Sequence, residues 1–482
     1  MYNLEDLTAQ GSETIFTVLQ VINKNCQSIC FITDNQKLVG VVTDGDIRRS
    51  LIQNPDLKRP IKYIMNQNFV SLPVNSSDEL IRSTFSKDLK LIPLLDANGV
   101  VVDVADVNKT HKIPVLEPAL NGRELEYVTD CIQTNWISSQ GQYVSRFESL
   151  FQQFHAPMHA VSVSNGTNAL HLALLALGIA PGDEVIVPNI TFAATVNAVI
   201  YCGARPVLCE IDPLTWCIDF NEAEKLITPR TKAIIPVHLY GQVSDIHHLL
   251  RLAETYNLFV VEDCAESLGS SWNSRLTGTF GDASIFSFFG NKTISTGEGG
   301  MVLFRDLELA SQARILRDHG MKPGKRYWHE TVGFNYRLTN IQAAIGVAQM
   351  ERFDSILQKK LLIATHYSSN LLHCSGIKQL PTSIPQTIHS NWLYTILLDD
   401  SMERDLLRDM LLRHGIDTRP AFYPMHQLPP FKEFPSSEKL DVSCKLARQG
   451  ISLPSSVTLT SSDLDYIIDI LRDSLISLAY LS

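Results

Sequence analysis

Three apolar runs after residue 155 end in polar residues that could do chemistry together. The run NLFVVED ends at Asp263, and Lys292 follows the run ASIFSFF within the loop SFFGNKTISTGEGG. The run HAVSVS is followed by an Asn-Gly-Thr turn at 165–167, which leads into an apolar helical pattern. Ligands gather at the carboxyl ends of strands in open α/β sheets, so we expect these groups to meet.

Each of these features has more than one interpretation on its own. Lys292 could be a solvated loop charge, a phosphate ligand or a covalent catalyst. Asp263 could be a helix N-cap, a magnesium ligand or a carboxylate that holds a proton on a ring nitrogen. The turn offers free amides, a hydroxyl and the positive end of a helix dipole, which suit a phosphate, although Thr167 could be a plain N-cap.

Taken together, the three features are the parts that a pyridoxal phosphate site requires. A lysine forms a Schiff base with the aldehyde of this cofactor, and a carboxylate keeps its pyridine nitrogen protonated. A helix N-terminus with hydroxyl groups anchors its phosphate. The combination favours Lys292 as a covalent catalyst.

Short apolar runs alternate with helical patterns from about residue 155 onward. Expected strands occupy residues 159–164, 183–189, 204–212, 232–241, 257–263, 283–289 and 299–304. Several of these runs are continuously apolar, which indicates strands buried on both faces and hence a mainly parallel sheet covered by helices. Strand signals thin after about residue 350, so we expect an α/β protein with a large domain at 121–350 and a smaller, helix-rich domain at 351–482.

Two stretches near the start of the chain resemble each other. Ile32–Ile47 and Leu94–Val107 each read as strand, polar turn and strand, followed by an acidic residue at the start of a helix. A duplication with a period of roughly 60 residues predicts two copies of one small α/β unit.

This repeat resembles a CBS-domain pair, or Bateman module, over residues 1–110. In that family a Thr/Ser-x-x-Asp motif holds the ribose of an adenosine-type nucleotide, and Thr43 and Asp46 match it in the first copy. The second copy departs from the motif, since Asp103 stands at the threonine position while Asp106 stands at the ribose position. The resemblance implies an adenine or guanine nucleotide regulator; the alternative is a packing or dimerisation module without a ligand. Residues 111–120 are expected to be a linker.

The rest of the chain, about 112–482, resembles the DegT/DnrJ/EryC1/StrS-type sugar-nucleotide aminotransferases of fold type I. The matching stretches are VSVSNGTNALHLALLALG, GDEVIVPNITFAATVNAV, VEDCAESLGS, GTFGDASIFSFFGNKTISTGEGGMV and RYWHETVGFNYRLTNIQAAIG. The resemblance implies that Lys292 carries the cofactor and shuttles protons, while Asp263 pairs with the pyridine nitrogen. It also implies that Gly166, Thr167 and Ser287 bind the cofactor phosphate.

Three further residues take roles from the same resemblance. Phe192 would stack on the pyridine ring, although an aromatic residue there could also be ordinary core packing. Glu266 would lie near the ring hydroxyl, and a glutamate at this position suits the perosamine branch of the family. Asn335 would reach the partner's cofactor phosphate across an interface, which implies an obligate homodimer with shared active sites and, through the CBS pair, a possible higher oligomer.

The activity implied is transamination of a nucleotide-linked 4-keto-6-deoxy sugar with glutamate as the amino donor. The branch points to GDP-4-keto-6-deoxy-D-mannose and to O-antigen lipopolysaccharide; UDP- or dTDP-linked sugars are the alternatives. Related sugar dehydratases carry His in place of Lys292, so lysine favours transamination. A nucleotide-sensing regulator with a non-catalytic aminotransferase-like domain is the competing class.

Several residues are candidate contacts to the sugar or nucleotide, although each could instead be a structural hydrogen-bonder, a core residue or a surface ion pair. They are Trp136, His238, His319, Trp328, Arg419 and His426.

Composition and charge argue against several classes of binding partner. The formal net charge of -10 argues against nucleic acid. The start lacks a basic region before an apolar core, so we expect no signal peptide. The run LHLALLALGIA is too short to cross a bilayer, which argues against a membrane partner. The nine cysteines lack metal-binding spacing, so we expect reduced thiols in a cytoplasmic protein without a metal site.

Overall fold

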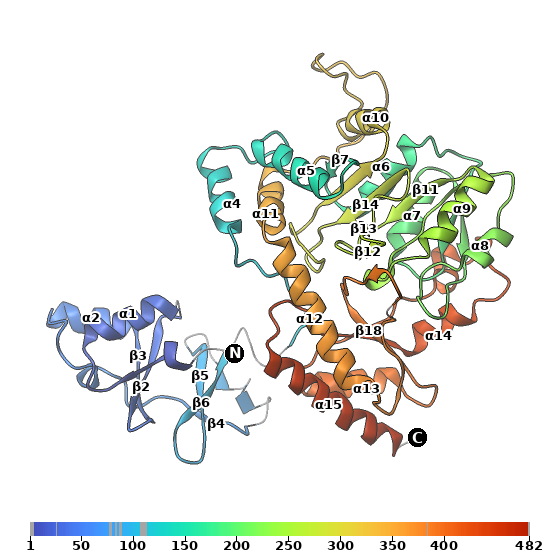
Figure 1. Ribbon diagram of the computed structural model, residues 1–482. Helices are drawn as coiled ribbons and strands as arrows, with labels where there is room; N and C mark the ends of the chain where they lie inside the picture. The colour runs from blue at the N-terminus through green and yellow to red at the C-terminus, as the bar shows by residue number, and fades with distance from the viewer. Residues whose placement is uncertain are drawn as a thin grey trace. The chain divides into compact units, whose positions relative to one another are not determined.

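The chain divides into two compact units, Met1–Lys112 and Ile113–Ser482, each of which is described by itself (Figure 1). The computed structural model describes residues 4–25, 27–76, 80–81, 84–85, 89–106, 113–382 and 384–480. Residues 111 and 112 of the expected linker lie outside these ranges. The next residues are bonded into the second unit, because the N–H of Ile113 donates to Gly415 O (2.7 Å) and the N–H of Ser455 donates to Val115 O (2.8 Å).

The N-terminal unit contains the predicted duplication. It holds two three-stranded sheets, β1 (Thr8–Gln10), β2 (Ile29–Asp34) and β3 (Lys37–Thr43), and β4 (Leu72–Pro73), β5 (Leu91–Leu95) and β6 (Val101–Asp106). In each sheet the first two strands are parallel and the last two form an antiparallel hairpin. Both hairpins carry a register irregularity, at Ile32/Thr33 and at Leu94/Leu95. The same order, directions and irregularity in both sheets confirm the repeat.

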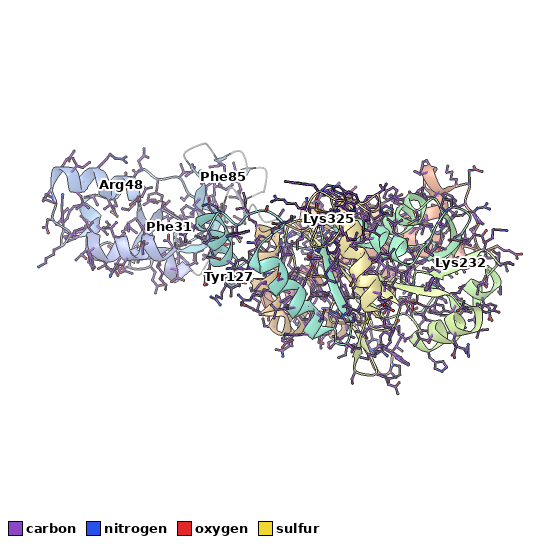
Figure 2. All side chains as sticks on the ribbon, turned by 90° about the horizontal axis from the view of Figure 1, so that it is seen from above. Phe31, Arg48, Phe85, Tyr127, Lys232 and Lys325 are labelled. Atoms are coloured by element: carbon purple, nitrogen blue, oxygen red, sulfur yellow. The ribbon has the colours of Figure 1, made fainter. Side chains whose placement is uncertain are left out.

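Buried apolar side chains join the two repeats. Phe31 of β2, which is labelled in Figure 2, is fully buried. It belongs to a cluster with Leu91 and Val104 of the second hairpin. Helices α1 (Ile15–Asn25) and α2 (Asp44–Gln53) cover the first sheet. The predicted acidic helix start is Asp44 in the first repeat. In the second repeat Asp106 does not start a helix, because it is the last residue of β6.

A seven-stranded sheet forms the centre of the second unit. Its strands in spatial order are β7 (His159–Val163), β15 (Gly300–Phe304), β14 (Ala283–Ser287), β11 (Phe259–Asp263), β10 (Thr231–Ile234), β8 (Glu184–Pro188) and β9 (Arg205–Cys209). β15 runs antiparallel to both of its neighbours, and every other pair is parallel. All seven predicted strands are therefore present, and the expected mainly parallel sheet is confirmed.

Helices cover both faces of this sheet, which is why its strands are apolar throughout. In β8, Val185 and Val187 pack against one layer while Ile186 packs against the other, since successive side chains of a strand point to opposite faces. The first layer is built from α6 (Gly166–Ala176), α7 (Ala193–Tyr201) and α10 (Leu307–Arg317). The second is built from α4 (Glu124–Gln133), α5 (Gln142–Phe154), α8 (Phe220–Lys225), α9 (Ile246–Tyr256) and α11 (Asn340–Met350).

The C-terminal part combines helices with a sheet that the sequence does not reveal. The helices are α12 (Phe353–Leu371), α13 (Arg404–Arg413), α14 (Asp441–Gln449) and α15 (Ser461–Ala479). They accompany an antiparallel sheet of β16 (Ile377–Gln379), β18 (Tyr394–Leu398), β20 (Gly450–Leu453) and β19 (Arg419–Pro420). Strands of two to five residues are too short to give a clear periodic signal.

Two general expectations can be compared with the structure. None of the eight described cysteines forms a disulfide. Over the described ranges, no helix is both long enough and apolar enough to cross a membrane.

Candidate active site at the carboxyl edge of the large sheet

Asp263 is the last residue of β11 and is almost completely buried, with 5% of its surface exposed. Its Oδ2 accepts a hydrogen bond from Thr195 Oγ1 (2.8 Å) on α7, and its Oδ1 accepts from the N–H of Ala265 (3.1 Å). Burial raises the pKa of the Asp263 carboxyl. No helix begins after β11, so Asp263 is not an N-cap. The residue is a buried acid at the edge of the sheet where ligands of such folds bind.

Lys292 lies in the loop between β14 and β15, and its amine is held by protein groups. Its side chain is 12% exposed, and Nζ is 3.5 Å from Glu266 Oε1. On another side, Nζ lies 3.8 Å from the centre of the Trp392 ring. Glu266 also accepts from the N–H of Tyr240 (2.9 Å), and burial raises the pKa of the Glu266 carboxyl. This burial excludes the interpretation of Lys292 as a solvated loop charge.

The Asn-Gly-Thr turn forms the N-terminus of α6. The N-cap is Asn165, whose side chain accepts from the N–H of Asn168 (2.8 Å). Thr167 is therefore not the N-cap, and the amides of Gly166 and Thr167 belong to the first turn, where a helix supplies no acceptor. A Cβ on Gly166 would lie 2.9 Å from Ser287 Cβ, so glycine allows this turn and the end of β14 to approach each other. The three predicted phosphate ligands thus meet at one place.

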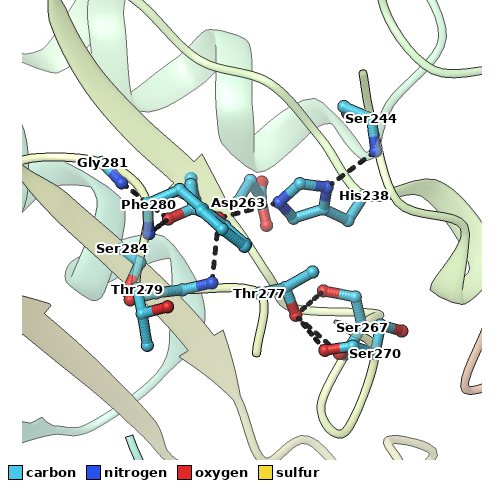
Figure 3. A network of polar contacts seen from close by, with 12 residues as sticks. His238, Ser244, Asp263, Ser267, Ser270, Thr277, Thr279, Phe280, Gly281 and Ser284 are labelled. Atoms are coloured by element: carbon cyan, nitrogen blue, oxygen red, sulfur yellow. Dashed lines mark hydrogen bonds and ion pairs between the residues drawn. The ribbon is translucent and has the colours of Figure 1, made fainter. Parts of the chain in front are cut away.

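A fully buried polar network supports the strand that carries Asp263 (Figure 3). Glu262 accepts from His238 Nε2 (3.0 Å) and from the amides of Gly278, Phe280 and Gly281. His238 Nδ1 accepts from the N–H of Ser244 (3.2 Å), which leaves the ring proton on Nε2. Burial alone would raise the pKa of Glu262, but the bonds from His238 and the amides bring it below its usual value.

This network also answers two questions about candidate ligands. His238, Glu262 and Cys264 are the one group that could hold a metal ion among the residues the structure describes. The carboxylate and the imidazole already have hydrogen-bond partners within the protein, so we assign them a supporting role. The expected contact of His238 with a sugar or nucleotide is wrong, because His238 has no exposed surface.

Four aromatic rings run from Phe192 to the lysine. Phe192, at the N-terminus of α7, is 61% exposed, so the interpretation as core packing is wrong. Its ring centre lies 6.2 Å from that of Phe422, which stacks on Tyr240 at 5.6 Å and 25°. Tyr240 in turn stacks on Trp392 at 6.4 Å and 20°. The four rings therefore form one side of the site, with the exposed Phe192 at one end and Trp392, beside the Lys292 amine, at the other.

Three of the predicted contacts lie on the segment 318–337, which follows α10. Asn335 is exposed, and its Oδ1 accepts from Arg337 Nε (3.1 Å). His319 Nε2 lies 3.3 Å from Arg337 Nη2, and Trp328 is half exposed beneath Lys325 Nζ, which is 3.6 Å from its ring centre. None of these contacts involves the residues around Lys292.

Of the remaining candidates, His426 is tied to the carboxyl end of the large sheet. Its Nδ1 is 2.9 Å from the amide nitrogen of Asn189, the residue after β8, and burial lowers the pKa of His426. Arg419 is 60% exposed and pairs with Asp417 at 3.3 Å, which matches the alternative of a surface ion pair. Trp136 is 56% exposed, and its carbonyl accepts from the side chain of Asn340.

In the N-terminal unit, Thr43 and Asp46 bond to each other. Thr43 Oγ1 accepts from the N–H of Asp46 (3.2 Å), while Asp46 Oδ2 accepts from Thr43 N–H (2.9 Å) and Oγ1 (2.6 Å). This is a capping box at the start of α2. Partial burial alone would raise the pKa of the Asp46 carboxyl. Hydrogen bonds from Thr43 and Arg49 outweigh this effect and hold the pKa of Asp46 below its usual value. Asp106 is buried at the end of β6, with 5% exposed.

The arrangement of the site residues agrees with the protein families that the sequence matches. Residues 118–472 match the DegT/DnrJ/EryC1/StrS aminotransferase family. The chain belongs to this family. Residues 4–53 of the aminotransferase match the CBS domain, so the enzyme carries a CBS domain ahead of its catalytic unit.

Relatives of the aminotransferase match it over nearly their whole length. The GDP-perosamine synthase of Caulobacter vibrioides is 45% identical over 367 residues, which cover 76% of this chain and 99% of that protein. The GDP-perosamine synthase of Vibrio cholerae is 46% identical over 346 residues, which cover 71% and 94%. Among solved structures, DesV of S. venezuelae is 36% identical with a TM-score of 0.69, covering 73% and 94%. The PLP-form of Spr1654 from Streptococcus pneumoniae is 28% identical with a TM-score of 0.72, covering 76% and 99%.

The protein is thus a pyridoxal-phosphate-dependent transaminase, and its residues fit this cofactor. The approach of Gly166 to Ser287 forms a cradle that a Cβ would fill, at a helix N-terminus suited to a phosphate. Asp263 offers a buried carboxylate for a ring nitrogen, and the exposed Phe192 offers a ring face. Lys292 offers an amine that the surrounding protein orients.

Sequence reasoning missed three residues that shape the site. Thr195 follows Phe192 by less than one helical turn, so the N-terminus of α7 could have suggested it. Trp392 and Tyr240 gave no such signal. Trp392 is distant in sequence from Lys292, and Tyr240 reaches Glu266 only through a left-handed backbone conformation, with φ of 55°.

Proposed function

We propose that this aminotransferase converts a nucleotide-linked 4-keto-6-deoxy sugar to its 4-amino derivative, with glutamate as the amino donor. The observation that carries the proposal is the buried Lys292 amine held between Glu266 and Trp392, at the same sheet edge as Asp263. We propose the GDP-linked mannose derivative as the substrate, because two relatives at 45% and 46% identity are named GDP-perosamine synthase.

In this proposal each residue performs one task. Pyridoxal phosphate, when bound, stabilises the negative charge that develops on the carbon bearing the nitrogen. Lys292 Nζ binds the cofactor and moves the proton to and from that carbon. Asp263 holds the proton of the ring nitrogen, and Thr195 orients the Asp263 carboxylate through their hydrogen bond. Glu266 keeps the amine in place and lies on the side of the ring hydroxyl.

The remaining ligands act on the cofactor's two ends. Gly166, Thr167 and Ser287 bind the phosphate, because helix amides and hydroxyl groups meet there. Phe192 covers the face of the ring, which its exposure permits. We propose Trp136, His319, Trp328 and His426 as contacts to the substrate, whereas Arg419 matches a surface ion pair with Asp417.

We further propose that the enzyme is a homodimer with shared sites. Asn335 is exposed on the segment 318–337, and its side chain accepts a hydrogen bond from Arg337 of the same segment. A phosphate ligand on such a segment would serve the partner's site. Analytical ultracentrifugation, combined with activity recovery on mixing Lys292→Ala and Asn335→Ala proteins, tests this. If the mixture regains no activity beyond the sum of its parts, the sites are not shared.

The N-terminal unit is proposed to bind an adenine or guanine nucleotide and to tune activity or assembly. The support is the CBS match and the Thr43–Asp46 pair at the end of β3. Calorimetry on the full chain with ATP, AMP, GTP and GDP tests it, with Asp46→Ala as the matched variant. Heat of binding that is unchanged in Asp46→Ala, or absent for all four nucleotides, contradicts the proposal and leaves a role in oligomerisation.

The substrate is tested with a panel of 4-keto-6-deoxy sugars linked to GDP, UDP and dTDP. Purified enzyme should show the visible absorption of the bound cofactor and lose it on addition of glutamate. Mass spectrometry should then detect a 4-amino sugar, and GDP substrates should react fastest. A chain that cannot be loaded with the cofactor would support the competing class, a non-catalytic regulator. A dehydrated product would contradict transamination.

A further inference from the structure

We propose that Trp392 is the positioning residue for the Lys292 amine, and that Lys360 acts through Trp392 by fixing its backbone. This inference rests on the proposed role of Lys292 as the reacting amine. Trp392 lies beside β18, in the C-terminal part of the chain, whereas Lys292 belongs to a loop of the large sheet. The contact therefore makes the reacting group depend on how the C-terminal part packs.

Trp392 contacts the lysine loop in two ways. The face of its ring lies 3.8 Å from Lys292 Nζ, and its indole Nε1 donates to Asn291 O (2.7 Å). The first contact acts on the amine, and the second fixes the backbone of the residue before it. A cation near an aromatic face is attracted by the ring quadrupole, and the attraction is stronger where water is excluded. The Lys292 side chain, 12% exposed, is such a case.

Trp392 and Glu266 flank Lys292 Nζ on two sides, and both contact Tyr240. Tyr240 stacks on Trp392, and its N–H donates to Glu266 Oε2 (2.9 Å). Tyr240 OH also accepts from the N–H of Phe422 (3.2 Å). One residue thus links the carboxylate and the aromatic face that together flank Nζ. Glu266 and Trp392 therefore both restrict the position of Lys292 Nζ.

Lys360 fixes Trp392 at its backbone. Lys360 lies on α12 and is 1% exposed. Its Nζ donates to Trp392 O (2.8 Å) and to Ser455 O (2.6 Å). Burial lowers the pKa of the Lys360 amine to about 7. Burying an amine costs solvation unless it is hydrogen-bonded, and among the described residues Lys360 bonds to two carbonyls and forms no ion pair, so we assign it the role of fixing the Trp392 backbone.

The test measures the reactivity of Lys292 in the cofactor-free full chain. Proteins are exposed briefly to a dilute acetylating reagent, and acetylation of Lys292 is followed by peptide mass spectrometry. Trp392→Leu removes the aromatic ring beside Lys292 Nζ. Because the ring no longer holds Nζ in place, acetylation of Lys292 should speed up by about tenfold. In Trp392→Phe the ring remains and the indole N–H is lost, so the increase should be about twofold to threefold. Trp272→Phe, at a tryptophan whose ring packs on Phe280 instead of the lysine loop, should match the wild type.

Lys360→Met tests the contact between Trp392 and Lys292 without changing either side chain. It leaves the Trp392 side chain intact and removes only the two bonds to the backbone, so Lys292 acetylation should rise by a factor between those of the two Trp392 variants. Circular dichroism melts identify variants that remain folded. If Trp392→Leu is unfolded, the Phe and Met variants decide the question. Acetylation of Lys292 at the wild-type rate in the folded variants overturns the proposal.

A kinetic measurement separates this inference from the proposed function. In the half-reaction with glutamate, Trp392→Leu should lower kcat by about tenfold and leave KM for glutamate unchanged, because positioning the amine does not bind the donor. An equal loss through KM would contradict positioning. If the wild type does not react with glutamate, the proposed function fails, while the acetylation pattern still reports whether Trp392 positions Lys292.

Discussion

Thr43 and Asp46 in the N-terminal unit and Asp263 and Lys292 in the second unit are polar residues at or just after strands, yet they are held differently. Thr43 and Asp46 satisfy each other within one turn of chain. Asp263 instead depends on Thr195 of α7, and Lys292 depends on Glu266 and Trp392 from other elements.

The two arrangements differ in the free energy that the folded protein gives up to hold them. A capping box stabilises its own helix and needs nothing further to explain it. Burying Asp263 and Glu266 raises the pKa of both carboxyls, so the fold holds these groups at the expense of their solvation. A polar cluster that is kept although it weakens the apoprotein is a better indicator of function than a motif that is satisfied locally.

The largest effect should come from removing the amine. Lys292→Ala should lower transamination by at least about 10³-fold, because no other described amine occupies this position. The matched control is Lys322→Ala, which breaks only the exposed ion pair with Glu330. Product formation is followed by mass spectrometry. More than about a tenth of the wild-type rate in Lys292→Ala would remove the contrast between the two units.

The next largest effect should separate activity from stability at Asp263. Asp263→Asn should lower the rate of the glutamate half-reaction by about 10²-fold, while the melting temperature stays level or rises, because burial already disfavours the charged carboxylate. Thr195→Val, which removes the hydrogen bond to Asp263, should lower the rate by about tenfold. Stopped-flow absorbance and thermal melts provide the two readings. A loss of stability parallel to the loss of rate would mean that Asp263 is a structural residue.

A smaller effect is expected at the phosphate turn. Gly166→Ala would place a Cβ 2.9 Å from Ser287 Cβ and should raise the Kd of pyridoxal phosphate by about tenfold. Gly290→Ala is the control, since a Cβ there meets nothing within 4 Å. Fluorescence titration of the cofactor-free protein measures both. Equal Kd values for the two variants would show that the close approach does not build the phosphate site.

The smallest effect is predicted for the N-terminal unit. Asp46→Ala should reduce the local stability of α2 by about 1 kcal/mol, through the loss of its capping box. Hydrogen exchange of the α2 amides in the full chain measures this, with Asp56→Ala as an exposed control. Transamination without added nucleotide should stay within about twofold of the wild type. A large loss of activity would show that Asp46 affects the catalytic unit directly.

Much of the fold of the second unit could be predicted, because its strands are buried on both faces. The seven predicted strands, from 159–164 to 299–304, each overlap a strand of the central sheet, and several of them are continuously apolar. The N-terminal repeat was also readable from its two matching hairpins. The C-terminal sheet was not, since strands as short as β19 leave no periodic pattern and form only where neighbouring strands are supplied by packing.

The site divides in the same way. Asp263 and Lys292 could be found because Asp263 ends one apolar run and Lys292 lies in the loop after another, and strand ends share one edge of a parallel sheet. Trp392 could not be found, because its contact with Lys292 joins segments that are distant in sequence. Tyr240 has an ordinary side chain on an unusual backbone, and sequence alone gives no reason for a tyrosine with φ of 55°.

The short strand β15 has a consequence for how this enzyme class can diverge. Gly300 pairs with both Val163 and Ser287, and the N–H of Phe288 donates to Gly299 O (2.9 Å), so the lysine loop is closed at its base. Mutations inside such a closed loop are insulated from the sheet that anchors it. An exchange of Lys292 for histidine, the residue found in related dehydratases, therefore needs no change in chain threading. A lineage can acquire a new reaction there while inheriting the scaffold intact.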